Sequence, residues 1–230
     1  MEKVGKIGES SFRVFLKNGP KFISPWHDIS WNLGEGYVPF VCEIPAGRTE
    51  KMEVCLTEKF NPILQDTHKN GKLRYWSKVP KFNYGMIPQT FEDPNSKCPI
   101  AGIAGDGDPI DVVDVARNTN LQVGSVVWAK VLASFCLIDK GEADWKILVS
   151  TSPTCELTKA FLEETCTFFE TYKIDAKNYV HNNRQLFNTT ETWDILDLAS
   201  KNYMKLVKSP QNPNDGTLKS DNPINNIWIR

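Results

Sequence analysis

Apolar and polar residues alternate in short runs through most of the first 150 residues. Three runs (FRVFL, PFVCEI and KMEVCLT) lie within residues 12–57, and four more (KLRYWSKV, IDVVDVA, GSVVWAKVLASFCLI and DWKILVST) lie within residues 72–150. A two-residue period with many β-branched residues is typical of strands that bury one face. Turn pairs such as Gly19-Pro20 and Asn61-Pro62 punctuate the runs. Because the strands are closely spaced and joined by short turns, the pattern favours a barrel over a sheet that alternates with helices.

Helical spacing occurs only in the last third of the chain. Residues 156–173 repeat apolar side chains on one stripe, which ends at Tyr172, so we expect the hydroxyl of Tyr172 to point inward or toward a cleft. Asn188, followed three residues later by Glu191, predicts a capping box that opens a second helix. The apolar stripes are Leu157, Phe161, Phe168, Phe169 and Tyr172 in the first helix, and Trp193, Leu196, Tyr203 and Leu206 in the second.

The last residues change in character. From about residue 208 the sequence KSPQNPNDGTLKSDNPINN is polar and rich in Pro and Asn, before a final apolar IWIR. We therefore expect one domain over residues 1–207 and a loosely attached tail over residues 208–230, anchored by its end.

Composition and charge narrow the class of protein. The 230 residues are 40% hydrophobic and 24% charged, as in globular proteins, and no apolar run reaches the roughly 18 residues that a membrane span needs. The net charge of −1 gives no general basic field for nucleic acid, so recognition of an anion must be local. The opening MEKVGKIGESS has no apolar signal region, which favours a cytoplasmic protein. Six cysteines without a CxxC pair are interpreted as buried thiols.

Four aspartates are crowded into residues 105–115, GDGDPIDVVDV. Crowded carboxylates repel one another unless a cation neutralises them, and Mg²⁺ prefers such oxygen ligands. A solvated Asp-rich turn explains the same residues, since Gly-Asp and Asp-Pro are common in turns. An EF-hand calcium loop starting at Asp106 is excluded, because Ile110 and Arg117 stand where it needs oxygen ligands.

Two further stretches pair acids with bases. In IDKGEADWKIL, Asp139, Glu142 and Asp144 surround a hairpin-like Lys140-Gly141 turn, and Asp144 shares one face of the following strand with Lys146. In CEIPAGRTEKMEVCL, Lys51 and Glu53 alternate in the same way, one strand after Glu43. Either pattern also fits charges that merely keep a turn or an edge strand soluble. Together with Arg74 and Tyr84, these stretches supply the parts of a site for several metals and a highly charged anion.

The sequence lacks the motifs of several other kinds of active site. The sequence contains no GxxxxGK[ST] phosphate loop, no GxGxxG, no HExxH and no GxSxG. Its three histidines are scattered without ligand spacing, so histidine catalysis is not expected.

These residues resemble the soluble, family I inorganic pyrophosphatases, especially the eukaryotic branch. The family signature Asp-x-Asp-Pro-x-Asp is matched at every fixed place by residues 106–111, DGDPID. The likeness runs from about Phe12 to Lys173 and includes FLKNGPKFISPWHDIS, NPILQDTHKNGKLRY, NYGMIPQTFEDP and DKGEADWK. It implies a mainly β fold, an OB-like closed barrel of five strands with flanking helices (α+β), and a homodimer in the cytoplasm that binds neither nucleic acid nor a membrane.

The resemblance also implies a reaction and roles for thirteen residues. The reaction is Mg²⁺-dependent hydrolysis of inorganic diphosphate to two orthophosphates, with two resident metals and one or two more that arrive with substrate. Metal lowers the pKa of the attacking water, Asp108 acts as general base, and Tyr84 is counted among both the catalytic and the phosphate-binding groups. The metal group comprises Asp106, Asp111 and Asp144, then Asp139 with Asp144 for the arriving metals, and Glu43 and Glu53 acting mainly through water. The phosphate-binding group comprises Lys51, Arg74, Tyr84, Lys146, Tyr172 and Lys173. Because cations offset the repulsion among the acids, we expect metal to stabilise the fold.

Two departures from the family pattern and two competing functions remain. Ala46 replaces an arginine that usually follows EIP, and Pro80 replaces a tyrosine often found four residues before Tyr84. The Asp-x-Asp form of residues 106–108 also suits a metal-dependent glycosyltransferase, which would need a βαβ nucleotide-binding half. A non-catalytic OB-type module that stacks single-stranded nucleic acid on Tyr75, Trp76 and Phe82 is the other alternative.

Overall fold

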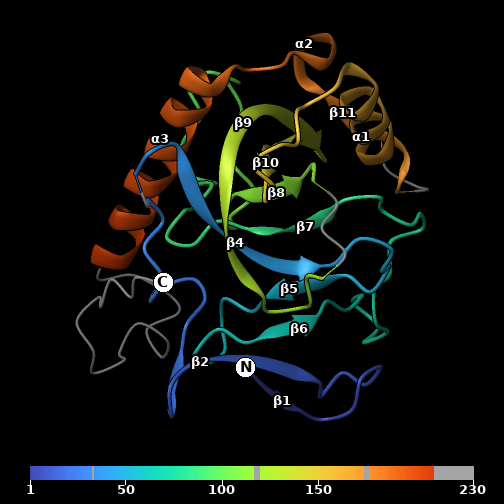
Figure 1. Cartoon of the computed structure of the whole chain (residues 1–230), viewed down its shortest axis with the longest axis vertical. Coiled ribbons are helices and arrows are strands. Elements are labelled where there is room, and N and C mark those ends of the chain that lie inside the picture. Colours follow the sequence, from blue (N-terminus) through green and yellow to red (C-terminus); the bar gives the residue numbers. More distant parts are fainter. Residues whose placement is uncertain (33, 117–119, 174–176, 210–230) are drawn as a thin grey trace.

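Five strands close on one another to form a barrel in the middle of the molecule (Figure 1). The structure, a computed structural model, describes residues 1–32, 34–116, 120–173 and 177–209. Around the ring, β4 pairs with β7, β7 with β8, β8 with β10, β10 with β9, and β9 with β4. Only the β8–β10 pair is parallel. The barrel strands are β4 (Tyr37–Ile44), β7 (Asn83–Met86), β8 (Asp111–Asp114), β9 (Val126–Asp139) and β10 (Glu142–Ser150). The closed five-stranded barrel predicted above is therefore confirmed.

A second, antiparallel sheet lies beside the barrel and carries the N-terminal part of the chain. Its strands run in the order β1-β2-β6-β5, with β3 paired to β2. Their bounds are β1 (Glu2–Val4), β2 (Arg13–Asn18), β3 (Lys21–Ile23), β5 (Met52–Val54) and β6 (Ile63–Gln65). The short strand β11 (Tyr179–Val180) adds to β9 in the barrel sheet.

The helices lie around the barrel, with α3 along one side and α1 and α2 near the far end of β9 (Figure 1). They are α1 (Lys159–Thr171), the four-residue α2 (His181–Arg184) and α3 (Thr189–Lys208). The predicted capping box is confirmed, because Asn188 accepts a hydrogen bond from the Glu191 N–H and Glu191 accepts one from the Asn188 N–H. No helix in the described part of the chain is long and apolar enough to cross a membrane.

The two faces of β10 show how the pattern of residues sets the packing. Trp145 and Ile147 point into one apolar cluster, which α3 completes with residues such as Leu196. The alternate positions Asp144 and Lys146 are also buried, but they face a polar cleft. Both faces of β10 are thus buried, and its charged pair, Asp144 and Lys146, lies on the face toward the cleft.

The hairpin between β9 and β10 has the expected two-residue turn. Lys140 and Gly141 both have positive φ, of 53° and 90°, and they connect the directly paired Asp139 and Glu142. Two such residues in sequence match the right-handed twist of the flanking strands. The turn holds Asp139 in the lining of the cleft.

One predicted strand is wrong. Residues 72–79 make only isolated bridges, Thr67 with Leu73 and Glu50 with Tyr75. Their alternation instead sends Trp76 into an aromatic cluster and Arg74 to the acids of the cleft, while Ser77 bonds the carbonyl of Tyr172. The side-chain alternation is therefore real, but the segment binds the end of α1 in place of a neighbouring strand.

Other expectations from the sequence are met in part. All six cysteines are free, so no disulfide is formed, but Cys55, Cys98 and Cys155 are only half-buried and not buried thiols as expected. The first helix begins at Lys159, three residues later than the predicted segment. Most of the predicted tail, residues 210–230 with the final IWIR, lies outside the described residues.

Backbones approach closely where β4 passes β7. Cys42 pairs with Gly85 and Ile44 with Tyr84, so Glu43 is an extra residue in a β-bulge. A Cβ atom on Gly85 would lie 1.9 Å from the carbonyl oxygen of Val41 and 2.9 Å from the amide nitrogen of Glu43. Only glycine fits at this point, and the bulge that it allows presents Glu43 to the cleft.

We expect Gly85→Ala to lower the free energy of unfolding by about 3 kcal/mol or more, because overpacking against backbone cannot relax as a side chain would. Urea denaturation measures this change. Gly102→Ala is the control: its φ of 68° is left-handed, but a Cβ there meets no atom within 4 Å, so its cost is only about 1–2 kcal/mol. Equal losses in the two variants would contradict the steric argument.

Candidate active site

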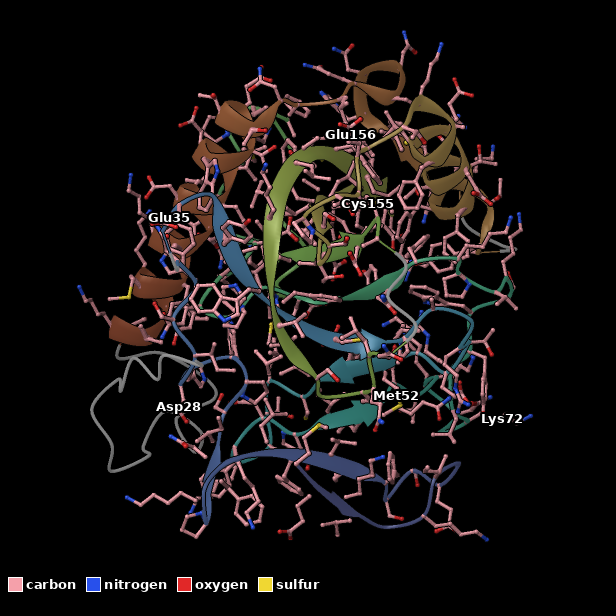
Figure 2. The ribbon with its side chains drawn as sticks, viewed as in Figure 1. Asp28, Glu35, Met52, Lys72, Cys155 and Glu156 are labelled. Atoms are coloured by element: carbon pink, nitrogen blue, oxygen red, sulfur yellow. The ribbon has the colours of Figure 1, made fainter. Side chains whose placement is uncertain are left out.

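A cleft of about 490 Å³ lies between the barrel and the second sheet. Twelve of the thirteen predicted site residues line it. The other, Lys146, is 1% exposed and lies in its wall, bonded to Asp111 and Asp144. Met52 of β5, labelled in Figure 2, lies where the second sheet meets the cleft. The twelve are Glu43, Lys51, Glu53, Arg74, Tyr84, Asp106, Asp108, Asp111, Asp139, Asp144, Tyr172 and Lys173.

A tight loop brings the first acids of residues 105–111 to the cleft. Gly107 has φ of 89°, a conformation that side chains disfavour, and the N–H of Asp108 donates to the Asp106 carboxylate at 3.0 Å. A Cβ on Gly105 would lie 2.4 Å from the carbonyl carbon of Glu92. Gly105, directly before the signature, and Gly107 within it are thus favoured by the backbone, and they help to fix where Asp106 and Asp108 lie.

Lys146 is the centre of the innermost network. Its ammonium donates to Asp111, to Asp144 and, at 3.2 Å, to the hydroxyl of Tyr84, which itself donates to Asp111. Burial disfavours the charged lysine, but Asp111 and Asp144 outweigh that effect and raise the pKa of Lys146. Burial and the same two acids raise the pKa of the Tyr84 hydroxyl, which therefore stays a neutral donor.

A second network joins β5 to the segment after β6. Lys51 bonds Glu53 and, at 2.9 Å, Asp66, and the guanidinium of Arg74 bonds the same oxygen of Asp66. Burial alone would raise the pKa of Asp66, but Lys51 and then Arg74 reverse this and hold it below its usual value. Asp66 therefore stays ionised and fixes two cations side by side.

A third ion pair lies in the lining of the cleft. Lys173, just after α1, bonds Oδ2 of Asp139, while Oδ1 of Asp139 is buried without a hydrogen-bond partner among the described residues. Burial lowers the pKa of Lys173 despite its partner. Tyr172 stacks on Phe168 with ring centroids 5.6 Å apart and meets the ring of Trp76 edge-on at 5.7 Å. The aromatic cluster thus holds Tyr172 at the cleft, as its place on the helical stripe predicts.

The remaining acids carry raised pKa values. Burial, then Asp108 and Asp111, raise the pKa of Asp106 to about 7, and burial, then Glu53, raise that of Asp108 to about 7. The side chain of Asp108 is nevertheless exposed at the cleft surface, so crowding by other acids contributes to its shift as well as burial. Glu43 is buried and bonds the N–H of Val54 at 2.7 Å, and burial, then Asp111, raise its pKa well above the usual range.

The charge balance of this cleft fits divalent cations. Among the described residues, eight acidic side chains line it against four basic ones. Two buried carboxylate oxygens, Oδ1 of Asp139 and Oε2 of Glu92, have no hydrogen-bond partner in the described part of the chain. One oxygen each of Glu92, Asp106 and Asp144 lie within 4.8 Å of one another. Hard oxygen ligands in excess of local positive charge are the donor set that Mg²⁺ prefers.

Two residues of this site were missed in the sequence. Asp66 lies in LQDTHKNGKLR, where the Asn70-Gly71 turn could have indicated that Asp66 faces Arg74; the Arg74 N–H donates to the Asp66 carbonyl at 2.8 Å. Glu92 lies in PQTFEDP, which has no periodicity to show that its side chain is buried. An acid that directly follows apolar residues was the only available signal for Glu92.

The two competing functions find little support in this geometry. Of the three aromatic residues named for base stacking, Trp76 and Phe82 are 5% and 3% exposed, so only Tyr75 is open to a stacked base. The only parallel strand pair among the described residues, β8 with β10, is joined through antiparallel β9 and not through a helix, so the nucleotide-binding half of a glycosyltransferase is lacking there.

Comparison with known proteins identifies the family. The family model described as inorganic pyrophosphatase matches residues 40–204. The chain belongs to the inorganic pyrophosphatase family. It is 44% identical over 150 residues to soluble inorganic pyrophosphatase 6, chloroplastic, of Arabidopsis thaliana, a match that covers 64% of this chain and 49% of the relative. It is 36% identical to the inorganic pyrophosphatase of Homo sapiens, over 87% of this chain and 76% of that protein.

Solved structures agree with the family and the fold. The crystal structure of type I inorganic pyrophosphatase from Toxoplasma gondii superposes with a TM-score of 0.83 at 32% identity, over 89% of this chain and 98% of that one. The resemblance to type I pyrophosphatases of eukaryotes, the OB-like barrel and the expectation of an inorganic diphosphatase enzyme are therefore confirmed.

The two departures from the family pattern lie next to each other and outside the described lining of the cleft. The N–H of Gly47, directly after Ala46, donates to the carbonyl of Pro80 at 2.9 Å. Ala46 itself borders a separate cavity of about 370 Å³. The two replacements thus change one region just after the end of β4. Neither of them is one of the thirteen predicted site residues of this pyrophosphatase chain.

Replacement of Asp66 tests the second network. We expect Asp66→Asn to lower the free energy of unfolding at pH 7 by about 1–3 kcal/mol, because Lys51 and Arg74 lose a shared charged partner. Since the pKa of Asp66 is lowered in the fold, its contribution is present at neutral pH and is lost as the pH falls through that lowered value. Urea denaturation at pH 7 and at low pH measures both effects. Asp197→Asn, which removes an exposed pair with Lys201, should change stability by less than about 0.5 kcal/mol.

The raised pKa values predict an unusual pH dependence. Asp106 titrates at about 7 in the fold but near 4 when unfolded, so the folded protein binds more protons between these values and loses stability as the pH rises through 7. His27, whose pKa burial lowers to about 4, acts in the opposite sense below about pH 6.5, so the comparison starts at pH 7. We expect chelator-treated protein to melt at a lower temperature at pH 8.5 than at pH 7. Added Mg²⁺ should reduce the decrease and leave the part that comes from the buried thiols of Cys42 and Cys136, whose pKa burial raises. A melting temperature that rises with pH in chelator would contradict this.

Proposed function

We propose that this pyrophosphatase hydrolyses inorganic diphosphate to two orthophosphates in a Mg²⁺-dependent reaction, with Asp108 as general base. The observation that carries the proposal is the meeting of acids and bases from both sheets and from the segment just after α1 in one cleft whose acids outnumber its bases. Family membership supplies the substrate, and the excess of carboxylates supplies the reason for divalent cations.

The acids divide by position. Asp106, Asp111 and Asp144 would hold the two resident cations, and Asp139 with Asp144 would hold those that arrive with substrate. Glu43 and Glu53 would bind mainly through water. When bound, Mg²⁺ neutralises the phosphates and lowers the pKa of the attacking water. The unpartnered Oδ1 of Asp139 supports its role, since a buried carboxylate oxygen without a donor is stabilised by a cation.

Asp108 would accept the proton of the attacking water. Its side chain is exposed to the cleft, and its raised pKa of about 7 matches the pH at which a general base is most effective. Neither oxygen of Asp108 donates or accepts in the hydrogen bonds described above, in contrast to Asp111 and Asp144, so it is free to take up a proton.

Six side chains would hold the two phosphates. Lys51, Arg74, Lys146 and Lys173 supply positive charge, and Tyr84 and Tyr172 donate hydrogen bonds without adding charge. As bond breaking moves negative charge onto the departing phosphate, the same cations stabilise it. Tyr84 is counted as catalytic as well because it lies between Asp111 and Lys146.

Assembly and location also belong to this proposal. A homodimer in the cytoplasm, without nucleic acid or a membrane as partner, is what the resemblance implies, although the relative from Arabidopsis thaliana is chloroplastic by name. The division into a domain over residues 1–207 and a tail from residue 208 likewise stays a prediction.

Asparagine substitutions test the roles of the acids. Asp111→Asn and Asp144→Asn should each lower Mg²⁺-dependent release of orthophosphate by about 100-fold or more, because each removes a ligand charge. Asp108→Asn should lower kcat by about 10²–10⁴-fold with little change in Mg²⁺ affinity. A colorimetric phosphate assay with and without Mg²⁺ measures both. Asp194→Asn, on the exposed face of α3, serves as the control with full activity. Wild-type protein loaded with Mg²⁺ that leaves diphosphate intact would exclude the proposal.

A further inference from the structure

Glu92 is fixed against the acid loop by its own backbone. Its N–H donates to the carbonyl of Asp108, and its carbonyl accepts from the N–H of Gly107, both at 2.9 Å. The absence of a side chain on Gly105 lets the two segments touch. Glu92 therefore keeps its position relative to Asp106 as long as the loop is folded.

The Glu92 carboxylate is buried and only half satisfied. The side chain is 5% exposed, and its Oε1 accepts a hydrogen bond from the N–H of Trp145 at 2.9 Å. Its Oε2 is buried with no hydrogen-bond partner among the described residues. Buried carboxylates in stable proteins are normally paired or bound to a metal, because an unsatisfied one is costly. A glutamate that served only to hold Trp145 would need neither the second oxygen nor the charge.

The neighbours of Glu92 increase that cost. Oxygens of Glu92, Asp106 and Asp144 lie within 4.8 Å of one another, and no lysine or arginine bonds Glu92 in the described structure. Oxygens that share one Mg²⁺ lie roughly 3–4 Å apart, because each bond is about 2.1 Å long. Small side-chain movements would thus let all three acids bind one ion. Asp111 is not one of the three acids whose oxygens meet this distance.

We propose that Glu92 completes the innermost divalent cation site together with Asp106 and Asp144, with Oε2 directed at the cation or at a water on it. This inference rests on the proposed function only in that the cation is one of those resident in the cleft. Glu92 acts here as a positioning residue, because it sets where and how tightly the cation is held and does not touch the substrate.

Glu92→Gln separates this role from a structural one. The glutamine keeps the size of the side chain and an oxygen that accepts from the N–H of Trp145. It carries no negative charge, and an NH₂ group, which donates hydrogen bonds, replaces Oε2. In chelator, the variant should be at least as stable as wild type, because burial, Asp106 and Asp144 all oppose a charge on Glu92 when no cation is bound. Titration of the metal-free protein with Mn²⁺, followed by calorimetry, should show the tightest binding step weakened about tenfold or more.

A matched substitution elsewhere in the cleft provides the control. Glu142→Gln removes an acid of the same type at the exposed end of β10, and Mn²⁺ should bind this variant within about twofold of wild type. Glu92→Asp keeps the charge but withdraws the oxygens by one methylene, so it should weaken Mn²⁺ binding without raising the melting temperature in chelator.

Two results would overturn the inference. One is Mn²⁺ binding by Glu92→Gln with wild-type affinity, and the other is loss of stability or of folding in chelator, which would assign Glu92 a purely structural role. Neither result depends on whether the protein hydrolyses diphosphate. Wild-type protein that binds Mn²⁺ tightly but leaves diphosphate intact would exclude the proposed function and leave this inference standing. Full Mg²⁺-dependent activity together with unchanged Mn²⁺ affinity in Glu92→Gln would exclude this inference and leave the proposed function standing.

Discussion

Repulsion among the carboxylates that share one cleft is the constraint on which the rest of this structure depends. The acids approach closely enough that burial and mutual charge raise the pKa of Asp106 and Asp108 to about 7 and those of Glu43 and Asp144 further. A cluster of this kind opposes folding unless cations neutralise it. Lysines and an arginine do so in part, and Glu92 is left without any cationic partner among the described residues.

The scaffold withstands that repulsion because it is closed and because the acids come from separate elements. β10 supplies Asp144 and is paired on both sides, to β8 and to β9, so it cannot move outward without breaking two ladders. Glu43 is held at a bulge that depends on Gly85, and the loop with Asp106 depends on Gly105 and Gly107. Each acid is thereby positioned by backbone geometry in addition to its own side-chain contacts.

Alternation along the chain was enough to predict the strand-rich barrel and the shared face of Asp144 and Lys146, since both follow from local period and turn chemistry. The strand expected at residues 72–79 failed because alternation reports which side chains are buried and not what buries them; there it is α1. Glu92 and Asp66 were missed for a related reason. The burial of Glu92 depends on hydrogen bonds to Asp108 and Gly107, which lie 16 and 15 residues further along the chain, and no local pattern records such contacts.

The lysines of the cleft are bonded to its acids, and this affects how the cleft can bind an anion. A lysine ammonium has three hydrogens to donate, and Lys146 directs all of them to Tyr84, Asp111 and Asp144. A phosphate oxygen can bind Lys146 only if one of these acceptors is released. A divalent cation held by Asp111 or Asp144, as proposed, would release them, because it would take over the neutralising role of the lysine. Lys51 and Lys173 are likewise bonded to Glu53 and Asp139. Binding of metal before the anion would therefore leave the fewest charges unpaired, and the same lysines would neutralise the acids before metal binds and the phosphates afterwards.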